Sequence, residues 1–312
     1  MFRLPPIVDA PFIVSDTTYI NPKYRGTRLP FGDEVDQEEL REMYFRKQFR
    51  VHDARMLKRA PSLEIEGFQL LQAPLPQLDF DNHELVTTRF YQHCNDLVKT
   101  ASGCHVARAV QHEFRIGKLI PGTAGMGIYG AAPHTDMTPP IEDIVESRSG
   151  RHFAIYNIWR SIDPERDIEV MPLALCDVNT VGAADLIYGN TKRRTIPQTR
   201  LIYCRLIHNP DQCWYYFPRM TPGEVLIFKQ YDTREENPCL RSTFHVALKD
   251  PTTRKGAPLR KSVDVRVMAT FPEKDTDRER RKERFRAQVP DAHLDGSFSQ
   301  WRYEKMTDWI YE

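Results

Sequence analysis

The sequence predicts a mainly β (α+β) fold, with a double-sheet jelly-roll core and flanking helices. Two observations predict it. Between residues 105 and 271, short segments rich in β-branched and aromatic residues alternate with Pro, Gly, Asn and Asp turns. In addition, 23 prolines and 15 glycines divide the 312 residues into short pieces. Because few helical patterns interrupt the strand patterns, alternating βαβ units are disfavoured.

The first third of the chain is predicted to support this core. Residues 1–60 have the composition of an irregular arm with one helix at 36–47, whose first residues are acidic, as suits a helix N-terminus. A strand pattern follows at 63–71. A helix is expected over 82–100, because Val86, Phe90, Cys94 and Leu97 recur at helical spacing.

The strand patterns of the core come next, and a charged tail follows them. The expected strands are 106–114, 125–129, 153–159, 173–177, 200–207, 214–217, 225–229, 243–248 and 262–271. In the tail, residues 273–286 mix both charge signs, which predicts a solvated helix. We therefore expect one domain over 1–312, with an N-terminal arm and support at 1–104, the jelly roll at 105–271 and a helical tail at 272–312.

Composition excludes several classes of partner. The chain carries 44 Lys and Arg against 43 Asp and Glu, so it lacks the basic surplus that nucleic-acid binding needs. No apolar run approaches the ~20 residues of a membrane span. The N-terminus has no secretory signal pattern and the six cysteines form no CxxC pair, which predicts reduced thiols and a cytoplasmic location. A monomer or homodimer is expected.

A His-x-Asp pair is the first candidate for chemistry. Of ten histidines, two have an acidic residue two positions on: His134-Thr-Asp136 and His293-Leu-Asp295. Side chains two apart on an extended segment point the same way and can hold one ion. The first pair follows the expected strand 125–129 through a bend of small residues. The second lies in the polar tail with no later histidine, which indicates a surface position.

A later histidine would complete a 2-His-1-carboxylate triad. Such a triad holds Fe(II) and leaves positions open for a cosubstrate and dioxygen. His245 is the favoured third ligand, because it lies in the strand pattern 243–248. His208 is the alternative, although it precedes the turn sequence Asn209-Pro210-Asp211.

A polar strand face provides a second signal. In the segment 260–267, period two places Arg260, Ser262, Asp264 and Arg266 on one face and the valines at 263, 265 and 267 on the other. Two arginines inside a barrel are costly unless an anion meets them. A dicarboxylate such as 2-oxoglutarate fits, because guanidinium groups bind carboxylates bidentately. An arginine–aspartate ladder on a solvent-facing sheet is the alternative.

Longer motifs connect these residues to a known family. They are His134-Thr-Asp-Met-Thr-Pro139, Tyr156-Asn-Ile-Trp-Arg160, Met171-Pro-Leu-Ala-Leu-Cys-Asp177, Trp214-Tyr-Tyr216, Met220-Thr-Pro-Gly-Glu-Val-Leu-Ile-Phe-Lys229, Phe244-His245, Asp250-Pro251 and Arg260-Lys-Ser-Val-Asp-Val-Arg266. The chain resembles the non-heme iron hydroxylase/desaturase family typified by AsaB and CmcJ, which includes fungal gibberellin desaturase. Ser161 departs from the family, where proline usually follows the arginine.

This resemblance implies a double-stranded β-helix (cupin-like) fold and an oxygenase that depends on Fe(II), 2-oxoglutarate and O2. It implies His134, Asp136 and His245 as metal ligands. Arg260 and Ser262 match the family's 2-oxoglutarate clamp, with Arg266 as helper or alternative. The reaction that the resemblance implies oxidises a small molecule of secondary metabolism through a ferryl intermediate. Hydroxylation, desaturation, ring closure and endoperoxide formation stay open, because the outcome depends on substrate pose.

Substrate contacts are expected from residues near these motifs. They are Tyr129, Met137, Trp159, Arg160, Tyr203, Trp214 and Tyr216. Packing between the sheets explains each aromatic side chain equally well. Two alternative functions stay open from the sequence: an iron-dependent oxidase that does not use 2-oxoglutarate, and a non-catalytic jelly-roll binding protein. A cosubstrate assay separates the first of these from the 2-oxoglutarate-dependent enzyme.

Overall fold

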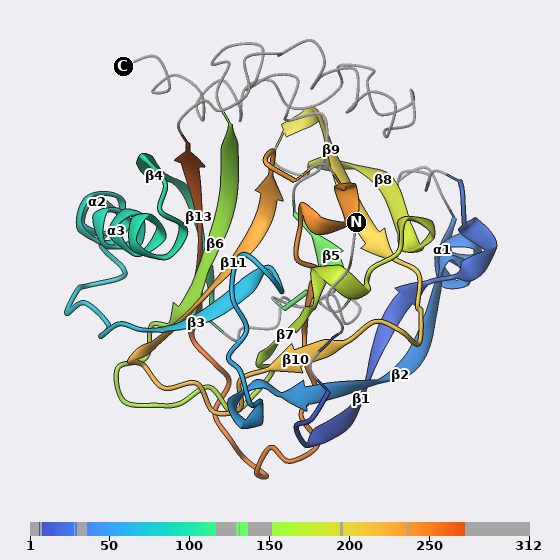
Figure 1. Ribbon diagram of the computed structural model, residues 1–312, viewed down its shortest axis with the longest axis horizontal. Coiled ribbons are helices and arrows are strands. Elements are labelled where there is room, and N and C mark those ends of the chain that lie inside the picture. The colour runs from blue at the N-terminus through green and yellow to red at the C-terminus, as the bar shows by residue number, and fades with distance from the viewer. Residues whose placement is uncertain are drawn as a thin grey trace.

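Two β-sheets form the body of the protein in a computed structural model (Figure 1). The structure describes residues 6, 8–27, 29, 36–116, 129–130, 132–136, 152–193, 196–235 and 237–271. An eight-stranded sheet has the order β1-β2-β10-β7-β12-β5-β9-β8, and a five-stranded sheet has the order β3-β11-β6-β13-β4. The predicted mainly β, two-sheet core is therefore confirmed.

The strands of the eight-stranded sheet come from most of the chain. They are β1 (Phe12–Ile20), β2 (Tyr44–Asp53), β5 (His134–Thr135), β7 (Leu173–Cys176), β8 (Leu186–Arg193), β9 (Ile196–Leu206), β10 (Trp214–Tyr216) and β12 (His245–Ala247). This sheet curls, and a bridge between Ile20 and Ile207 joins the ends of β1 and β9. One apolar cluster fills the curl, and a second lies between the two sheets.

The five-stranded sheet carries the helical layer on its outer face. Its strands are β3 (Phe68–Gln72), β4 (Val106–Arg115), β6 (Phe153–Ser161), β11 (Glu224–Asp232) and β13 (Ser262–Thr270). The helices α2 (His83–Leu85) and α3 (Tyr91–Ser102), joined by a π turn over Val86–Phe90, lie against β4 and β13 (Figure 1). Buried side chains of this helical segment, with Cys94 and Val98 among them, pack on that outer face. The predicted 82–100 helix is thus confirmed apart from its π turn.

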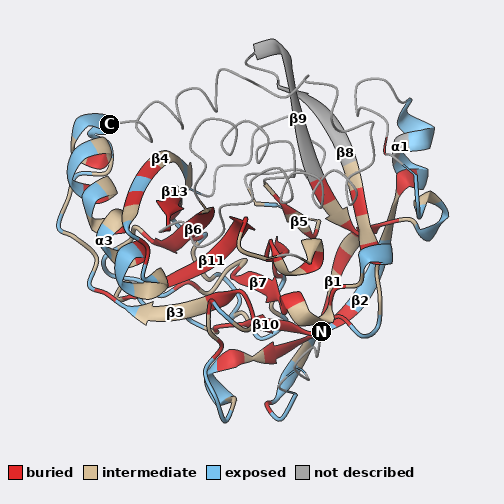
Figure 2. Ribbon diagram, turned by 45° about the horizontal axis from the view of Figure 1, so that its top comes forward, coloured by how far each residue is buried: buried red, intermediate tan, exposed pale blue. Residues whose placement is uncertain are grey.

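Burial is concentrated in the central strands. Every residue of β6 and β11 is buried, whereas the outer side of α3 and the described side chains of α1 (Gln37–Met43) other than Met43 are exposed (Figure 2). A strand buried on both faces keeps its side chains in fixed positions. These strands therefore provide a rigid floor for a site. In the described part of the chain, no helix has the length and apolar character needed to span a membrane.

The structure corrects three predicted elements. The irregular arm at 1–60 is wrong, because β1 and β2 form an antiparallel pair there. Its strand pattern is hidden, since the buried positions of β1 include Ser15 and Thr17. The helix at 36–47 ends at Met43, where β2 begins. Strand β8 was not predicted, because Gly189 and Asn190 are typical of turns.

Some predictions fall outside the described residues. They include most of the strand 125–129, the tail 272–312 and Met137. The division into an arm, a jelly roll and a tail therefore stays a prediction.

Candidate metal centre

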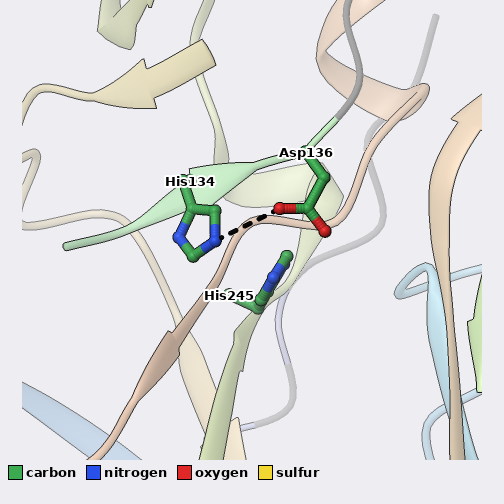
Figure 3. A group of neighbouring side chains, drawn as sticks. All are labelled: His134, Asp136 and His245. Atoms are coloured by element: carbon green, nitrogen blue, oxygen red, sulfur yellow. Dashed lines mark ion pairs between the residues drawn. The ribbon is translucent and has the colours of Figure 1, made fainter. Parts of the chain in front are cut away.

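Two neighbouring strands of the eight-stranded sheet bring two histidines together. In the pairing of β12 with β5, His245 lies directly opposite His134, and their ring centres are 4.4 Å apart. Asp136 follows the end of β5, and its Oδ1 lies 3.4 Å from His134 Nε2. Figure 3 shows the three side chains turned toward one another.

The three side chains could hold one metal ion. One donor atom from each of His134, Asp136 and His245 lies within 4.8 Å of the others. His208, the alternative third ligand, lies elsewhere, with its ring centre 5.1 Å from that of Tyr19. The second His-x-Asp pair, at 293–295, lies outside the described residues.

Backbone carbonyls orient both imidazole rings. His134 Nδ1 lies 2.8 Å from the carbonyl of Ala132, and His245 Nδ1 lies 3.3 Å from that of Thr243. When Nδ1 is held by a carbonyl, Nε2 is left to face a metal. A glycine is needed nearby, since a Cβ at Gly130 would lie 2.6 Å from His134 Cε1.

The charge state of the triad suits a divalent cation. Burial, and then the neighbouring His134, lower the pKa of His245 to about 3, so this imidazole is neutral at physiological pH. Burial alone would raise the pKa of Asp136, but Arg266 and the two histidines hold it well below its usual value. Neutral imidazole and ionised carboxylate are the forms that bind metal ions.

One oxygen of Asp136 is already hydrogen-bonded. Arg266 Nη2 lies 2.9 Å from Asp136 Oδ2, and Asn157 Nδ2 lies 3.4 Å from the same oxygen. The backbone N–H of Asp136 donates to Gln230 Oε1 over 3.0 Å. Sequence reasoning missed Asn157 and Gln230. Asn157 had a detectable signal, because it is two residues before Trp159 and therefore shares its strand face.

The polar row of β13 faces the eight-stranded sheet. Its three valines pack on the other side, in the cluster beneath α3. In register, Ser262, Asp264 and Arg266 lie opposite Ser161, Trp159 and Asn157 of β6, and opposite Arg115, Glu113 and Gln111 of β4. The period-two prediction for this strand is confirmed. We call its inward side chains, together with Arg260, the inner row.

Several buried atoms of the inner row, and of two side chains on the neighbouring strands β6 and β11, have no hydrogen-bond partner among the described residues. They are Arg260 Nε, Ser262 Oγ, Asp264 Oδ1, Arg266 Nε, Asn157 Oδ1 and Gln230 Nε2. Unpartnered buried polar atoms are costly unless a ligand satisfies them. Their concentration beside the triad therefore indicates a polar ligand.

Arg260 is the strongest of these indications. Its guanidinium lies 4.3 Å from the ring centre of Tyr129 and 5.0 Å from that of Trp159, and Nη1 donates to the carbonyl of Met171. Burial lowers its pKa to about 9. No carboxylate pairs with it among the described residues, so an anionic ligand such as 2-oxoglutarate fits this position.

The structure separates the predicted substrate residues into two groups. Tyr129 and Trp159 lie beside Arg260, and the Tyr129 hydroxyl donates to the Arg260 carbonyl over 3.2 Å. Trp214 lies on the opposite face of its sheet and packs on Phe49, with ring centres 5.4 Å apart. The sequence did not show which alternate residues of this strand face the site, so Trp214 was assigned to the wrong face. Tyr216 lies on the same face as Trp214.

Arg160 also differs from its expected position. It points to the outer face of β6, where Nη2 donates to the carbonyls of Ala73 and Pro222 over 2.9 and 2.6 Å. Arg160 therefore lies on the face of β6 that points away from the triad. The side chain of Tyr203 and the whole of Met137 lie outside the described part.

Comparisons with known proteins find relatives of this chain among oxidoreductases. A family model described as an oxidoreductase/YMDC permease-like domain (YDMC) matches residues 17–270. The hydroxylase/desaturase efuI of Hormonema carpetanum is 27% identical over 259 residues, which cover 72% of this chain and 84% of efuI. The hydroxylase/desaturase asaB of Aspergillus flavus is 33% identical over 132 residues, 38% of this chain and 56% of asaB. The family resemblance predicted from the motifs is confirmed.

A third relative matches in both sequence and structure. The Fe(II)/2-oxoglutarate-dependent dioxygenase nvfI of Aspergillus novofumigatus is 30% identical over 239 residues, 70% of this chain and 81% of nvfI. A solved structure of the iron and alpha-ketoglutarate-dependent endoperoxidase NvfI superposes with a TM-score of 0.69 at 22% identity, covering 84% of this chain and 99% of that one. The predicted jelly-roll fold is therefore confirmed.

Proposed function

The chain belongs to the YDMC oxidoreductase family and is an Fe(II)- and 2-oxoglutarate-dependent oxygenase; from this premise we propose which residues bind its two cofactors. His134, Asp136 and His245 bind the iron. Arg260 and Ser262 bind the distal carboxylate of 2-oxoglutarate. One observation supports both assignments: three ligand atoms within 4.8 Å lie beside a buried row of polar atoms that have no partner.

The residues of the site contribute by their charge and by orienting the bound groups. When bound, iron, 2-oxoglutarate and O2 supply the oxidation of a substrate C–H bond, with succinate and CO2 as products. Asp136 contributes one negative charge and the two imidazoles none, so with Fe(II) bound the site would carry a net charge of about +1, which would attract an anionic cosubstrate. Arg260 attracts the distal carboxylate strongly, because the rings of Tyr129 and Trp159 keep water from its guanidinium.

The substrate is a small organic molecule, and secondary metabolism is its proposed source. Tyr129 and Trp159 are the described residues that we place closest to it. The relatives named hydroxylase/desaturase and endoperoxidase indicate that one fold supports several outcomes. We expect hydroxylation, desaturation or oxidative ring closure, with the outcome set by substrate pose. The enzyme acts as a cytoplasmic monomer or homodimer, which light scattering and cell fractionation would test.

Anaerobic titration tests the proposed function. Purified protein receives Fe(II) and then 2-oxoglutarate, and a weak visible charge-transfer band reports chelation of the keto acid by iron. Air is then admitted and succinate is measured. We expect the band and succinate from the wild type and neither from His245→Ala. Iron binding without a band would favour an oxidase that does not use 2-oxoglutarate. No iron binding would contradict the triad and favour a binding protein.

A further inference from the structure

We infer that Arg266 is a positioning residue for the iron-binding carboxylate of Asp136 and does not bind 2-oxoglutarate. This inference rests on the proposed function and assigns a different partner to the second arginine of the inner row. The resemblance left Arg266 as a helper or alternative to Arg260. The contacts of the two side chains separate these roles.

Both terminal nitrogens of Arg266 already have partners. Nη2 lies 2.9 Å from Asp136 Oδ2, and Nη1 donates to Gln111 Oε1 over 2.7 Å. Arg260, in contrast, makes one hydrogen bond, to the carbonyl of Met171, and no ion pair among the described residues. Arg260 is therefore the arginine that is free to receive an anion.

The neighbouring strands fix the Arg266 side chain in place. Gln111 of β4 and Asn157 of β6 lie directly opposite Arg266 on its two sides. Asn157 Nδ2 lies 3.4 Å from Asp136 Oδ2 and 3.2 Å from Asp264 Oδ2, so this amide links the same carboxylate to the inner row. Three adjacent strands of one sheet thus hold Asp136, which itself belongs to the other sheet.

This arrangement determines which oxygen of Asp136 faces the metal. Arg266 and Asn157 occupy Oδ2, whereas Oδ1 lies on the side of His134 Nε2, 3.4 Å away. Asp136 therefore offers Oδ1 as a single ligand atom. Hydrogen bonds to the second oxygen orient a ligating carboxylate, and their loss typically weakens metal binding by about 10–100-fold.

The separation of the two arginines, one in β13 and one just before it, supports separate roles. Arg260 and Arg266 are six residues apart, with Ser262 and Asp264 between them on the same face. Arg266 lies at the Asp136 end of the inner row, and Arg260 lies at the Tyr129 and Trp159 end. Iron is therefore expected at one end of the row and the distal carboxylate at the other.

The test compares Arg266→Gln with Arg260→Gln as a matched control. Two dissociation constants are measured anaerobically: that of Fe(II), by competition with a chelator, and that of 2-oxoglutarate at saturating Fe(II), by the charge-transfer band. For Arg266→Gln we expect iron affinity to fall by about 10–100-fold, while the affinity for 2-oxoglutarate stays within about twofold. Arg260→Gln should show the reverse. Arg266→Lys should recover part of the iron affinity, because it keeps the charge without the two-nitrogen fork.

Each outcome decides between the two roles. If Arg266→Gln weakens 2-oxoglutarate binding and leaves iron binding unchanged, the inference is overturned. No change in either constant also overturns it. Failure of the wild type to bind iron or 2-oxoglutarate would instead contradict the proposed function. Should Arg266→Gln not fold, Gln111→Leu removes the support of Arg266 from its other side, and a smaller loss of iron affinity is expected.

Discussion

Two buried arginines lie on opposite faces of the five-stranded sheet, and their surroundings differ. Arg160, on the outer face of β6, donates to the carbonyls of Ala73, Pro74 and Pro222 and contacts His93 Nε2. Arg260, at the start of the inner row, donates to one carbonyl. Burial lowers the pKa of both, to about 10 for Arg160 and about 9 for Arg260.

The difference shows what buried charge does on each face. On the outer face, four acceptors lie around the two terminal nitrogens of Arg160, and only its Nε has no partner among the described residues. The guanidinium thereby fastens the loops around residues 73 and 222 to the sheet. On the inner face, Arg260 keeps hydrogen-bonding capacity that the described residues do not use. Unused capacity of this kind is typical of a ligand site, and it costs stability.

The largest effect is expected from removing one of the proposed metal ligands, His245. For His245→Ala we expect no iron binding and activity at background level, because two ligands hold the ion too weakly. His245 Nδ1 contacts only a backbone carbonyl, so the fold should survive. Metal analysis and far-UV circular dichroism check both statements. His208→Ala is the control, and equal loss of iron in that variant would contradict the assigned triad.

Replacing each arginine by methionine in turn distinguishes the roles of the two faces. Arg260→Met should raise the KM for 2-oxoglutarate by about 10–100-fold, since a charged hydrogen-bonded pair contributes about 1.5–3 kcal/mol. Arg160→Met should leave that KM unchanged and lower the free energy of unfolding by at least about 3 kcal/mol, because several buried carbonyls lose their donor. Steady-state kinetics and urea unfolding measure the two effects. A large increase in the KM for 2-oxoglutarate in Arg160→Met would contradict the assignment of ligand binding to Arg260 and of a structural role to Arg160.

Adding a methyl group next to His134, by Gly130→Ala, tests whether the position of this ring matters for iron binding. In Gly130→Ala the new Cβ would lie 2.6 Å from His134 Cε1, so the ring must move from its place beside Asp136. We expect iron affinity to fall by about 10-fold. Gly223→Ala is the matched control, because the nearest atom to its Cβ is 3.7 Å away. Anaerobic titration of both variants checks this, and equal iron affinity would contradict it.

The smallest expected effect concerns Asp264. Burial, and then the charge of Asp136, raise the pKa of Asp264 to about 7 from an ordinary 3.8. The folded state therefore keeps a proton that the unfolded chain releases, and the free energy of unfolding should fall as pH rises from about 4 to about 7.

Asp264→Asn tests this pH dependence. The metal-free variant should be more stable than wild type at pH 8, by about 1–3 kcal/mol, and should gain nothing at pH 4. Urea unfolding across pH measures the difference. If the wild type is as stable as the variant at pH 8, burial of the ionised Asp264 carboxylate does not lower the free energy of unfolding, and the prediction is wrong.

The sequence predicted which side chains of the triad come together better than it predicted the periphery of the fold. Side chains two residues apart on a strand point the same way, and this rule can be applied to a short stretch of sequence. It is enough to predict that His134 and Asp136 share one side and that residues 260–266 alternate. Asn157, Gln230 and Gln111 were missed because their roles depend on which strands are neighbours. Trp214 was misplaced because a one-residue change of parity reverses the face of a strand.

Tertiary packing also hid the first two strands. Ser15 and Thr17 are buried in β1, so its alternation of apolar and polar residues does not mark the inward face. Similarly, four of the ten residues of Tyr44–Asp53 are charged, and the pairing of this strand with β1 and β10 decides its structure. Local propensity alone could not predict either strand.

A crystal structure grown anaerobically with Mn(II), as a redox-stable substitute for iron, and 2-oxoglutarate tests the central claim most directly. We predict the ion on His134, Asp136 Oδ1 and His245, the distal carboxylate on Arg260 and Ser262, and Arg266 still paired with Asp136 Oδ2. A 2-oxoglutarate molecule held by Arg266, with Arg260 in its present contacts, would contradict the account.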